Sequence, residues 1–327
     1  MLRGMLVDTD TASDDAVALI MALRSPDIRV LAMTTVAGNV GLAQASTNAL
    51  YVAELCGSPA PVYAGAAAPL CRPAHHAEWF HGRDGLGDHG YPPPRRGVES
   101  MHAVDAIIAT IQANPGLTLV TLGPLTNIAL ALERHPEIAG KVGRCVLMGG
   151  NPCCEGNVTP AAEYNIWCDP EAALMVLRSG MAVDLVGWHL CRGEAVLSGT
   201  DIARVLSLGT PLARFAIECN STAMEAYGVQ TGETGISLPD PVAMAIALDP
   251  AICTSRSRHA VQIETASELT RGMTVVDRLN VAGDERNREV WQNAPYADVC
   301  WSLDAPRWKQ RLCECLSLPG NPVKKTD

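Results

Sequence analysis

The sequence contains no uninterrupted apolar run of the ~18 or more residues that a membrane-spanning helix needs. Positive charge is also scarce, because 25 Lys and Arg residues face 35 Asp and Glu residues and give a formal net charge of −10. Such a balance is unfavourable for contact with the phosphate backbone of a nucleic acid. The N-terminus enters a strand-like pattern at once, without the features of a signal peptide. We therefore expect no membrane or nucleic-acid partner, and a cytoplasmic protein.

Metal-binding cysteine motifs are missing, although cysteine itself is not. The twelve cysteines are irregularly spaced and form no C-x-x-C pair, which argues against a structural zinc site. In a long chain with its own core, we expect most of them to be reduced apolar fillers. The adjacent Cys153 and Cys154 lie in a polar loop near candidate site residues, and a structural role is the favoured interpretation for them.

Common nucleotide-binding and hydrolase motifs are absent as well. No G-x-G-x-x-G follows the first predicted strand, where acidic residues stand instead. The segment from Gly82 to Gly87 lacks the Lys-Ser/Thr ending of a P-loop. No G-x-S-x-G elbow of a serine hydrolase is present. These absences argue against a dinucleotide site, a phosphate cradle and a Ser–His–Asp hydrolase.

What is present is a regular alternation of strand-like and helix-like segments. The 327 residues, 48% hydrophobic and 18% charged, supply ample material for a large core. Strands are predicted at 5–7, 28–36, 61–63, 117–122, 141–148 and 182–186, and helices at 14–23, 43–55, 103–113, 127–134, 170–179 and 242–248. This order predicts an α/β fold with a mostly parallel central sheet and helices on both faces. We expect one domain over residues 1–327.

Two segments stand outside this alternation. Residues 69–94 are polar and rich in His, Gly and Pro, and they are too many for a plain connection, so we expect a functional loop or lid. From about Arg256 onward, strands followed by a helix at 305–316 are predicted to pack onto the same body.

The most unusual local feature is a cluster of four acids, Asp8, Asp10, Asp14 and Asp15, at the junction of the first strand and the first helix. Gathering like charges beside apolar segments is costly unless a cation offsets them. Mg²⁺ and Ca²⁺ bind oxygen ligands of this kind. A solvated turn with helix-dipole acids would explain Asp14 and Asp15 but not Asp8 and Asp10. The cluster therefore favours a metal or catalytic site.

Other polar segments are predicted at the same edge of the sheet, beyond the carboxyl ends of its strands. They are Asn39, His81–Gly87, Leu122–Asn127, Met148–Asn151, Asn157–Asn165 and Leu238–Pro241. Each has a structural alternative, such as a helix cap at Thr126 or Asp240, or a turn at Asn39. Ligands of open α/β sheets bind at this edge, and the convergence of the segments there favours a binding site.

The acid cluster resembles the N-terminal D-x-D-x-G-x-D-D-A signature of the inosine–uridine-preferring nucleoside hydrolase family. The resemblance spans about residues 5 to 250 and is carried by Asp8–Ala16, Thr35–Asn39, His81–Gly85, Gly123–Asn127, Met148–Gly150, Asn157–Asn165 and Asp240-Pro241. It implies the Rossmann-like nucleoside hydrolase fold, a bound Ca²⁺ and hydrolysis of a nucleoside N-ribosidic bond to ribose and free base. It also implies a homodimer or homotetramer.

The resemblance further implies roles for individual residues. The Ca²⁺ ligands would be Asp10, Asp15, the main-chain carbonyl of Leu122, and Asp240. Substrate contacts would come from Asp14 and Asn39 at the ribose diol, from Asn157, Glu163 and Asn165 at the 5′-hydroxyl, from His81 at the base, and from Asp240. Asp8 would support the metal site from behind. Asp10 would serve as the general base that activates a metal-bound water.

The sequence departs from the family at one position that matters for catalysis. Many members carry a histidine directly before the last metal-binding aspartate, where it is taken to protonate the leaving base, and here that residue is Pro239. His81, His76, Tyr227 or a thiol of Cys153 or Cys154 could replace it. Alternatively, the base could leave without a protein acid, the substrate could be a modified N-riboside, or the chain could bind ribose or a nucleoside without turnover. The base preference does not follow from the sequence.

A smaller departure is Thr11-Ala12, which replaces the common Pro-Gly of the signature. Alanine tolerates a positive φ poorly, so the turn can differ slightly, and we expect the site to survive this change.

Overall fold

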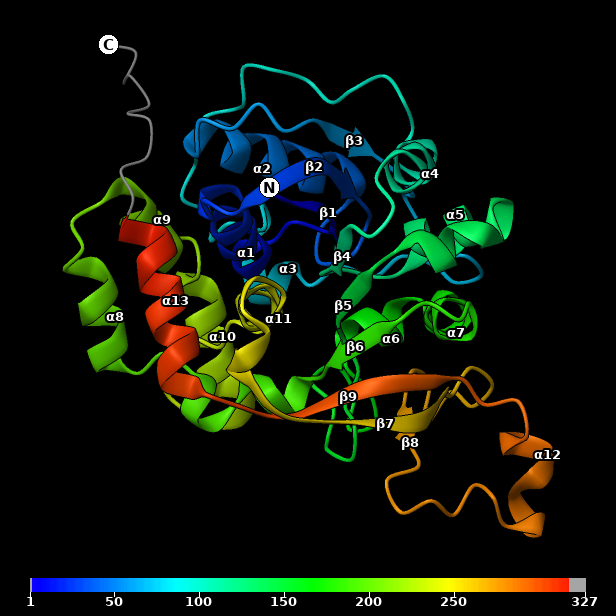
Figure 1. The fold of residues 1–327 in the computed structure, drawn as a ribbon. Helices are drawn as coiled ribbons and strands as arrows, with labels where there is room; N and C mark the ends of the chain where they lie inside the picture. Colours follow the sequence, from blue (N-terminus) through cyan, green and yellow to red (C-terminus); the bar gives the residue numbers. More distant parts are fainter. Residues whose placement is uncertain (1, 318–327) are drawn as a thin grey trace.

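The computed structural model describes residues 2–317, and its centre is one nine-stranded sheet (Figure 1). The strands are β1 (Arg3–Thr9), β2 (Ile28–Thr35), β3 (Val62–Ala64), β4 (Thr118–Thr121), β5 (Arg144–Met148), β6 (Val183–Val186), β7 (Cys253–Ile263), β8 (Thr274–Val276) and β9 (Tyr296–Leu303). Their order across the sheet is β3-β2-β1-β4-β5-β6-β9-β7-β8.

Most of this sheet is parallel. Strands β1 to β6 pair in parallel with their neighbours, and β9 joins β6 in the same direction. Strand β7 is antiparallel to both β9 and β8. The predicted α/β class with a mostly parallel sheet is therefore confirmed, and the C-terminal segment adds the predicted strands at one edge.

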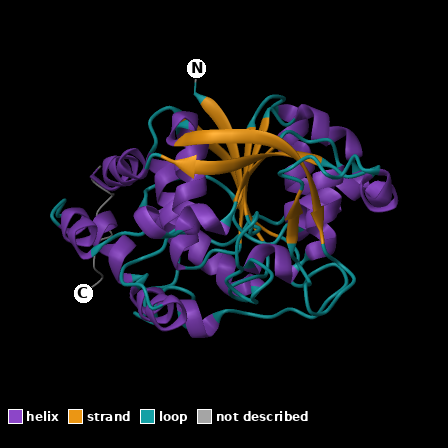
Figure 2. Ribbon diagram, turned by 90° about the horizontal axis from the view of Figure 1, so that it is seen from below, coloured by secondary structure: helices purple, strands orange, loops and turns teal. Residues whose placement is uncertain are grey.

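Helices cover both faces of the sheet (Figure 2). They are α1 (Ser13–Arg24), α2 (Leu42–Leu55), α3 (Glu78–His81), α4 (Ala103–Ala113), α5 (Thr126–Arg134), α6 (Tyr164–Cys168), α7 (Pro170–Arg178), α8 (Gly199–Leu206), α9 (Pro211–Glu218), α10 (Ser221–Thr231), α11 (Pro239–Leu248), α12 (Arg288–Trp291) and α13 (Ala305–Ser317). Helices α1, α2, α11 and α13 pack together on one side, and α4, α5 and α7 pack together on the other.

Side chains alternate between two buried cores along each central strand. On β1, Met5 and Val7 pack into the core with α1 and α11, whereas Leu6 packs into the core with α4 and α5. A strand buried on both faces must be apolar at successive positions, which explains the uninterrupted apolar run of β1. The two cores fix the strands, so that the loops beyond their carboxyl ends meet at one edge.

The segment 69–94 forms a long connection whose only helix is the four-residue α3. It lies over the carboxyl edge of the sheet near β1 and β2, held by bonds such as that from the Ala77 N–H to the Asn39 carbonyl, 2.9 Å. Helices α8, α9 and α10, between β6 and α11, were not predicted from the sequence. Within residues 2–317, no helix is both long enough and apolar enough to cross a membrane.

Candidate active site

The Asp10 carboxylate lies just beyond β1 and is held by the backbone of two neighbouring turns. It is fully buried. A Cβ atom on Gly38 would lie 2.0 Å from its Oδ2, and one on Gly123 would lie 2.8 Å from its Oδ1. The Asn39 N–H donates to Oδ2 at 2.5 Å, whereas Oδ1 has no hydrogen-bond partner among the described residues. One oxygen is thus fixed and the other is left for a ligand.

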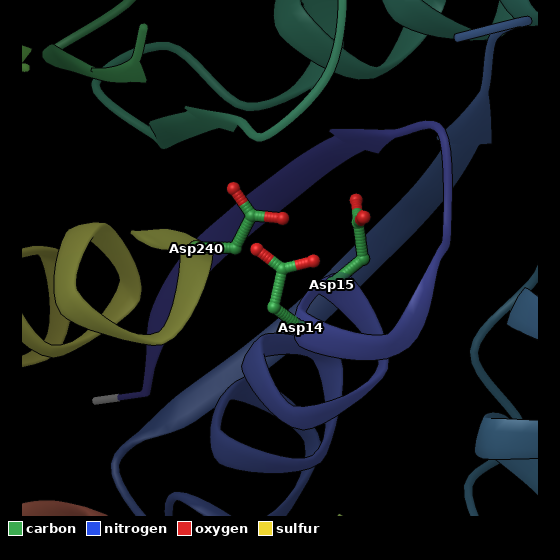
Figure 3. Close-up of side chains that lie close together, drawn as sticks. All are labelled: Asp14, Asp15 and Asp240. Carbon is green, nitrogen blue, oxygen red and sulfur yellow. The ribbon is translucent and has the colours of Figure 1, made fainter. Parts of the chain in front are cut away.

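Three further carboxylates, those of Asp14, Asp15 and Asp240, lie close to one another (Figure 3). Asp14 and Asp15 come from the first turn of α1, and Asp240 comes from the first turn of α11. Each offers an oxygen within 4.8 Å of the oxygens of the other two, and all three residues are buried. The group forms because α1 and α11 pack against each other with their N-terminal ends adjacent.

Burial and mutual repulsion destabilise the charged form of these carboxylates, and a bound cation would offset both effects. Burial and the neighbouring charge of Asp14 raise the pKa of Asp15 to about 7. Burial, followed by the charge of Asp15, raises the pKa of both Asp10 and Asp240 well above the usual range. Asp14 Oδ1, like Asp10 Oδ1, has no hydrogen-bond partner among the described residues. An all-oxygen, anionic donor set of this kind suits a hard divalent ion such as Ca²⁺.

Only some of the predicted metal ligands belong to this group. Asp15 and Asp240 belong to it, and Asp14, which the resemblance assigned to the ribose, is its third member. Asp10 stands outside the group, although its charge raises the pKa of Asp240. The Leu122 carbonyl accepts the Asn165 side-chain amide at 2.8 Å, which leaves its second lone pair available.

Asp8 lies behind the cluster in a polar network. Its Oδ1 accepts hydrogen bonds from the Thr34 hydroxyl at 2.5 Å and from the Asn127 side-chain amide at 2.9 Å. Asn127 in turn accepts from the Ala66 N–H and donates to the Thr35 carbonyl, so it ties three strand ends together. This positioning role of Asn127 was not predicted, although the residue lies in one of the quoted motifs.

A cavity of about 350 Å³ opens above the carboxylates. Its lining includes Asp14, Asn39, His81, Leu122, Asn157, Glu163, Asn165 and Asp240. All the residues predicted to contact substrate therefore face one space. Asp10 and Asp15 are not among the lining residues, and both are fully buried.

Glu163 and its neighbours form one polar wall of the cavity. The Glu163 carboxylate caps α6 and accepts from the N–H groups of Gly150 at 2.8 Å and Asn165 at 2.9 Å. Burial raises its pKa to about 7. The Asn157 side-chain oxygen accepts from the Tyr164 N–H at 2.9 Å, which holds its amide in place. The wall therefore presents rigid polar groups.

Aromatic residues also contribute to the lining. Phe, Trp and Tyr make up only 4% of the chain, yet Trp79, Phe80, Tyr164, Trp167 and Trp188 all line this cavity. These rings were not predicted from the sequence, because they are scattered over 110 positions from 79 to 188 and follow no period. Their flat faces suit a planar heterocycle such as a nucleobase.

Only some of the candidates for a leaving-group acid line the cavity. His76 and His81 line the cavity, as does Pro239. Tyr227 does not, because it is fully buried with its hydroxyl bonded to Glu233.

Cys153 and Cys154 are also absent from the lining. Cys153 is exposed, and burial raises the pKa of Cys154 to about 11. The two thiols are therefore not placed to protonate a ligand in the cavity.

Comparisons with known proteins agree with this geometry. The sequence profile described as "Inosine-uridine preferring nucleoside hydrolase" matches residues 5–310. The "Pyrimidine-specific ribonucleoside hydrolase RihA" of Shewanella sp. (strain ANA-3) is 40% identical over 89% of this chain and 91% of its own length.

Solved structures give the same result. A structure titled "Plant nucleoside hydrolase - PpNRh1 enzyme" superposes with a TM-score of 0.92 at 31% identity, covering 98% of this chain and all of the other. The "Purine-Preferring Ribonucleoside Hydrolase from Gardnerella vaginalis" has a TM-score of 0.86 at 31% identity, covering 96% of this chain and 98% of the other. The chain therefore belongs to the inosine-uridine preferring nucleoside hydrolase family, whose members hydrolyse N-glycosidic bonds.

Proposed function

We propose that this protein is a Ca²⁺-dependent hydrolase that converts a ribonucleoside to ribose and free base, with Asp10 as general base. The observation that carries the proposal is the buried carboxylate group at a cavity whose lining combines polar groups with aromatic rings. A sugar with three hydroxyls and a flat base matches the two kinds of lining.

The free oxygen of Asp10 is central to the chemistry. As the bond between the anomeric carbon and the base nitrogen breaks, positive charge develops on the ribose. The surrounding carboxylates stabilise that charge, because they are fixed before the reaction begins. Asp10 Oδ1, which has no partner, accepts a proton from the attacking water.

Asp10, Asp15, Asp240 and the main-chain carbonyl of Leu122 are the groups that would hold the ion, and two of these carboxylates belong to the buried group. When bound, Ca²⁺ supplies a positive centre that orients the ribose diol and makes a neighbouring water more acidic. Asp14 and Asn39 would hold the diol, and Asn157, Glu163 and Asn165 would hold the 5′-hydroxyl. Fixing the sugar at several hydroxyls converts binding energy into correct positioning.

A direct test measures ribose released from a panel of purine and pyrimidine nucleosides. Both classes are needed, because the similar proteins include one named pyrimidine-specific and one named purine-preferring. We expect turnover with Ca²⁺, loss of turnover after chelation and recovery when Ca²⁺ is added back. Asp10→Asn should lower kcat by about 10²-fold or more. Asp105→Asn, an exposed acid on α4, is the matched control.

Two results would contradict the proposal. Turnover that persists after complete chelation would show that the reaction does not depend on Ca²⁺. Ribose binding seen by calorimetry without turnover of any nucleoside would identify the chain as a non-catalytic binder. Turnover limited to modified N-ribosides would keep the chemistry and change the substrate, an outcome that Pro239 in the cavity lining makes worth testing.

A homodimer or homotetramer in the cytoplasm remains our expectation for its assembly and location. Light scattering of the purified protein tests the first point, and fractionation of cells tests the second.

A further inference from the structure

His76 occupies a defined position at the cavity, although no family motif contains it. Its ring lines the cavity, and its Nδ1–H donates to the Gly38 carbonyl at 2.7 Å. The next residue makes a second hydrogen bond to the same turn, because the Ala77 N–H donates to the Asn39 carbonyl at 2.9 Å. The two bonds tie the 69–94 segment to the turn that holds Asp10 and faces the ribose position.

The bond to Gly38 fixes which nitrogen of His76 can exchange a proton. A carbonyl oxygen only accepts, so Nδ1 must carry a hydrogen in both charge states of the ring. Nε2 is then bare in the neutral ring and protonated in the imidazolium. The described residues give Nε2 no hydrogen-bond partner, and the side chain is open to solvent, from which it can recover a proton.

His81, the other cavity histidine among the candidate acids, is less suited to giving up a proton. Its Nδ1 lies 2.8 Å from the Ser13 hydroxyl and 3.9 Å from Asp14 Oδ1. It is therefore engaged with the carboxylate group, and Pro239, at the family's acid position, has no proton to give.

We propose that His76 is the catalytic acid that protonates the leaving base, a role that rests on the proposed hydrolase function. The bond between the anomeric carbon and the base nitrogen breaks, and its electron pair goes to the base. The His76 Nε2 proton passes to the base, the water oxygen bonds to the anomeric carbon, and Asp10 takes the water proton. Exchange with solvent then returns a proton to His76 and removes one from Asp10.

The test compares two substrates with leaving groups of different basicity. His76→Asn keeps a side-chain amide that can donate to the Gly38 carbonyl but removes the nitrogen that carries the proton. For the best natural nucleoside, we expect kcat to fall by about 10²- to 10⁴-fold, with KM little changed. For p-nitrophenyl β-D-ribofuranoside, whose phenolate leaves without protonation, we expect a change of roughly threefold at most.

His135→Asn is the matched control, because His135 is half exposed and pairs with Glu137 on the surface. It should match the wild type on both substrates. Equal losses on both substrates for His76→Asn would reduce His76 to a positioning residue and overturn the proposal. An unchanged nucleoside rate would also overturn it and leave the hydrolase function intact. A wild type that cleaves neither substrate would instead overturn the hydrolase function itself.

Discussion

Gly38 and Gly123 decide where the Asp10 carboxylate can lie. Both turns pass so close to it that a side chain at either position would overlap a carboxylate oxygen. A general base acts only when its oxygen is held at the right distance from the water. The lack of a side chain at Gly38 and at Gly123 is therefore a requirement of the site, as the acids are.

Gly38→Ala tests this dependence on space. Its Cβ would lie 2.0 Å from Asp10 Oδ2, so the carboxylate must move away from the Asn39 N–H. We expect kcat to fall by roughly 10²-fold, because a displacement of about 1 Å has that effect on positioned groups. Gly97→Ala is the control, since its Cβ would meet no atom within 4 Å. Equal activity of the two variants would show that the close approach is unimportant.

Three of the predicted site residues could be placed from the sequence because they come after strands of the sheet. Asp10 and Leu122 directly follow β1 and β4, Asn39 lies in the turn after β2, and parallel strands end at a common edge. The rings of Trp79, Trp167 and Trp188 were not predictable in this way. They come from loops and short helices, and only the folded chain brings them to one cavity.

Asp184 joins three strands of the sheet through two arginines. It lies on β6, nearly buried, and its Oδ2 contacts Arg144 of β5 at 2.6 Å and Arg256 of β7 at 2.8 Å. Removing the Asp184 carboxylate would leave the guanidinium groups of Arg144 and Arg256 without this ion-pair partner. Both arginines are partly exposed, so solvent offsets part of the loss.

Asp184→Ala should therefore lower the free energy of unfolding by ~2 kcal/mol, less than for a fully buried pair. Denaturant unfolding with and without the substitution measures this change. Nucleoside KM should stay the same, because Asp184 does not line the cavity. A loss of affinity without a loss of stability would contradict the structural role of these contacts.

The strands and helices that alternate along the chain were predicted to within a few residues, whereas three consecutive helices were not. Helix α1 was expected at 14–23 and spans Ser13–Arg24, because its apolar run is uninterrupted. Helices α8, α9 and α10 follow one another between β6 and α11 without a strand between them, and α8 and α9 pack against α13. They lie outside the strand–helix alternation that marks the other elements, so the sequence pattern did not reveal them.

Over the whole molecule, the fold gathers buried acids that the chain separates widely. Asp8, Asp15 and Glu163 are each buried, and burial raises the pKa of each to about 7. In the unfolded chain, the same carboxyls lose their protons near pH 4. Without a cation, the folded state therefore holds protons that the unfolded state has already released.

This difference sets the sign of the pH dependence. Stability without metal is fully present below about pH 4 for these groups and is lost as the pH rises toward about 7. A cation that binds only the folded state adds stability and competes with the protons for the same oxygens. In chelator, the midpoint temperature of thermal unfolding should therefore be lower at about pH 8 than at about pH 5.5. The increase in this temperature caused by Ca²⁺ should be larger at the higher pH.

Variants at the carboxylate group complete the test. Asp240→Asn should reduce the Ca²⁺-induced increase in unfolding midpoint, because one of three clustered carboxylates is lost. Asp105→Asn, an exposed acid paired with Arg134, should leave that increase unchanged. If Ca²⁺ raised the midpoint equally in both variants, the ion would bind outside the group. If chelated wild-type protein became more stable as the pH rose, the buried acids would be ionised already, and some other positive charge would have to hold them.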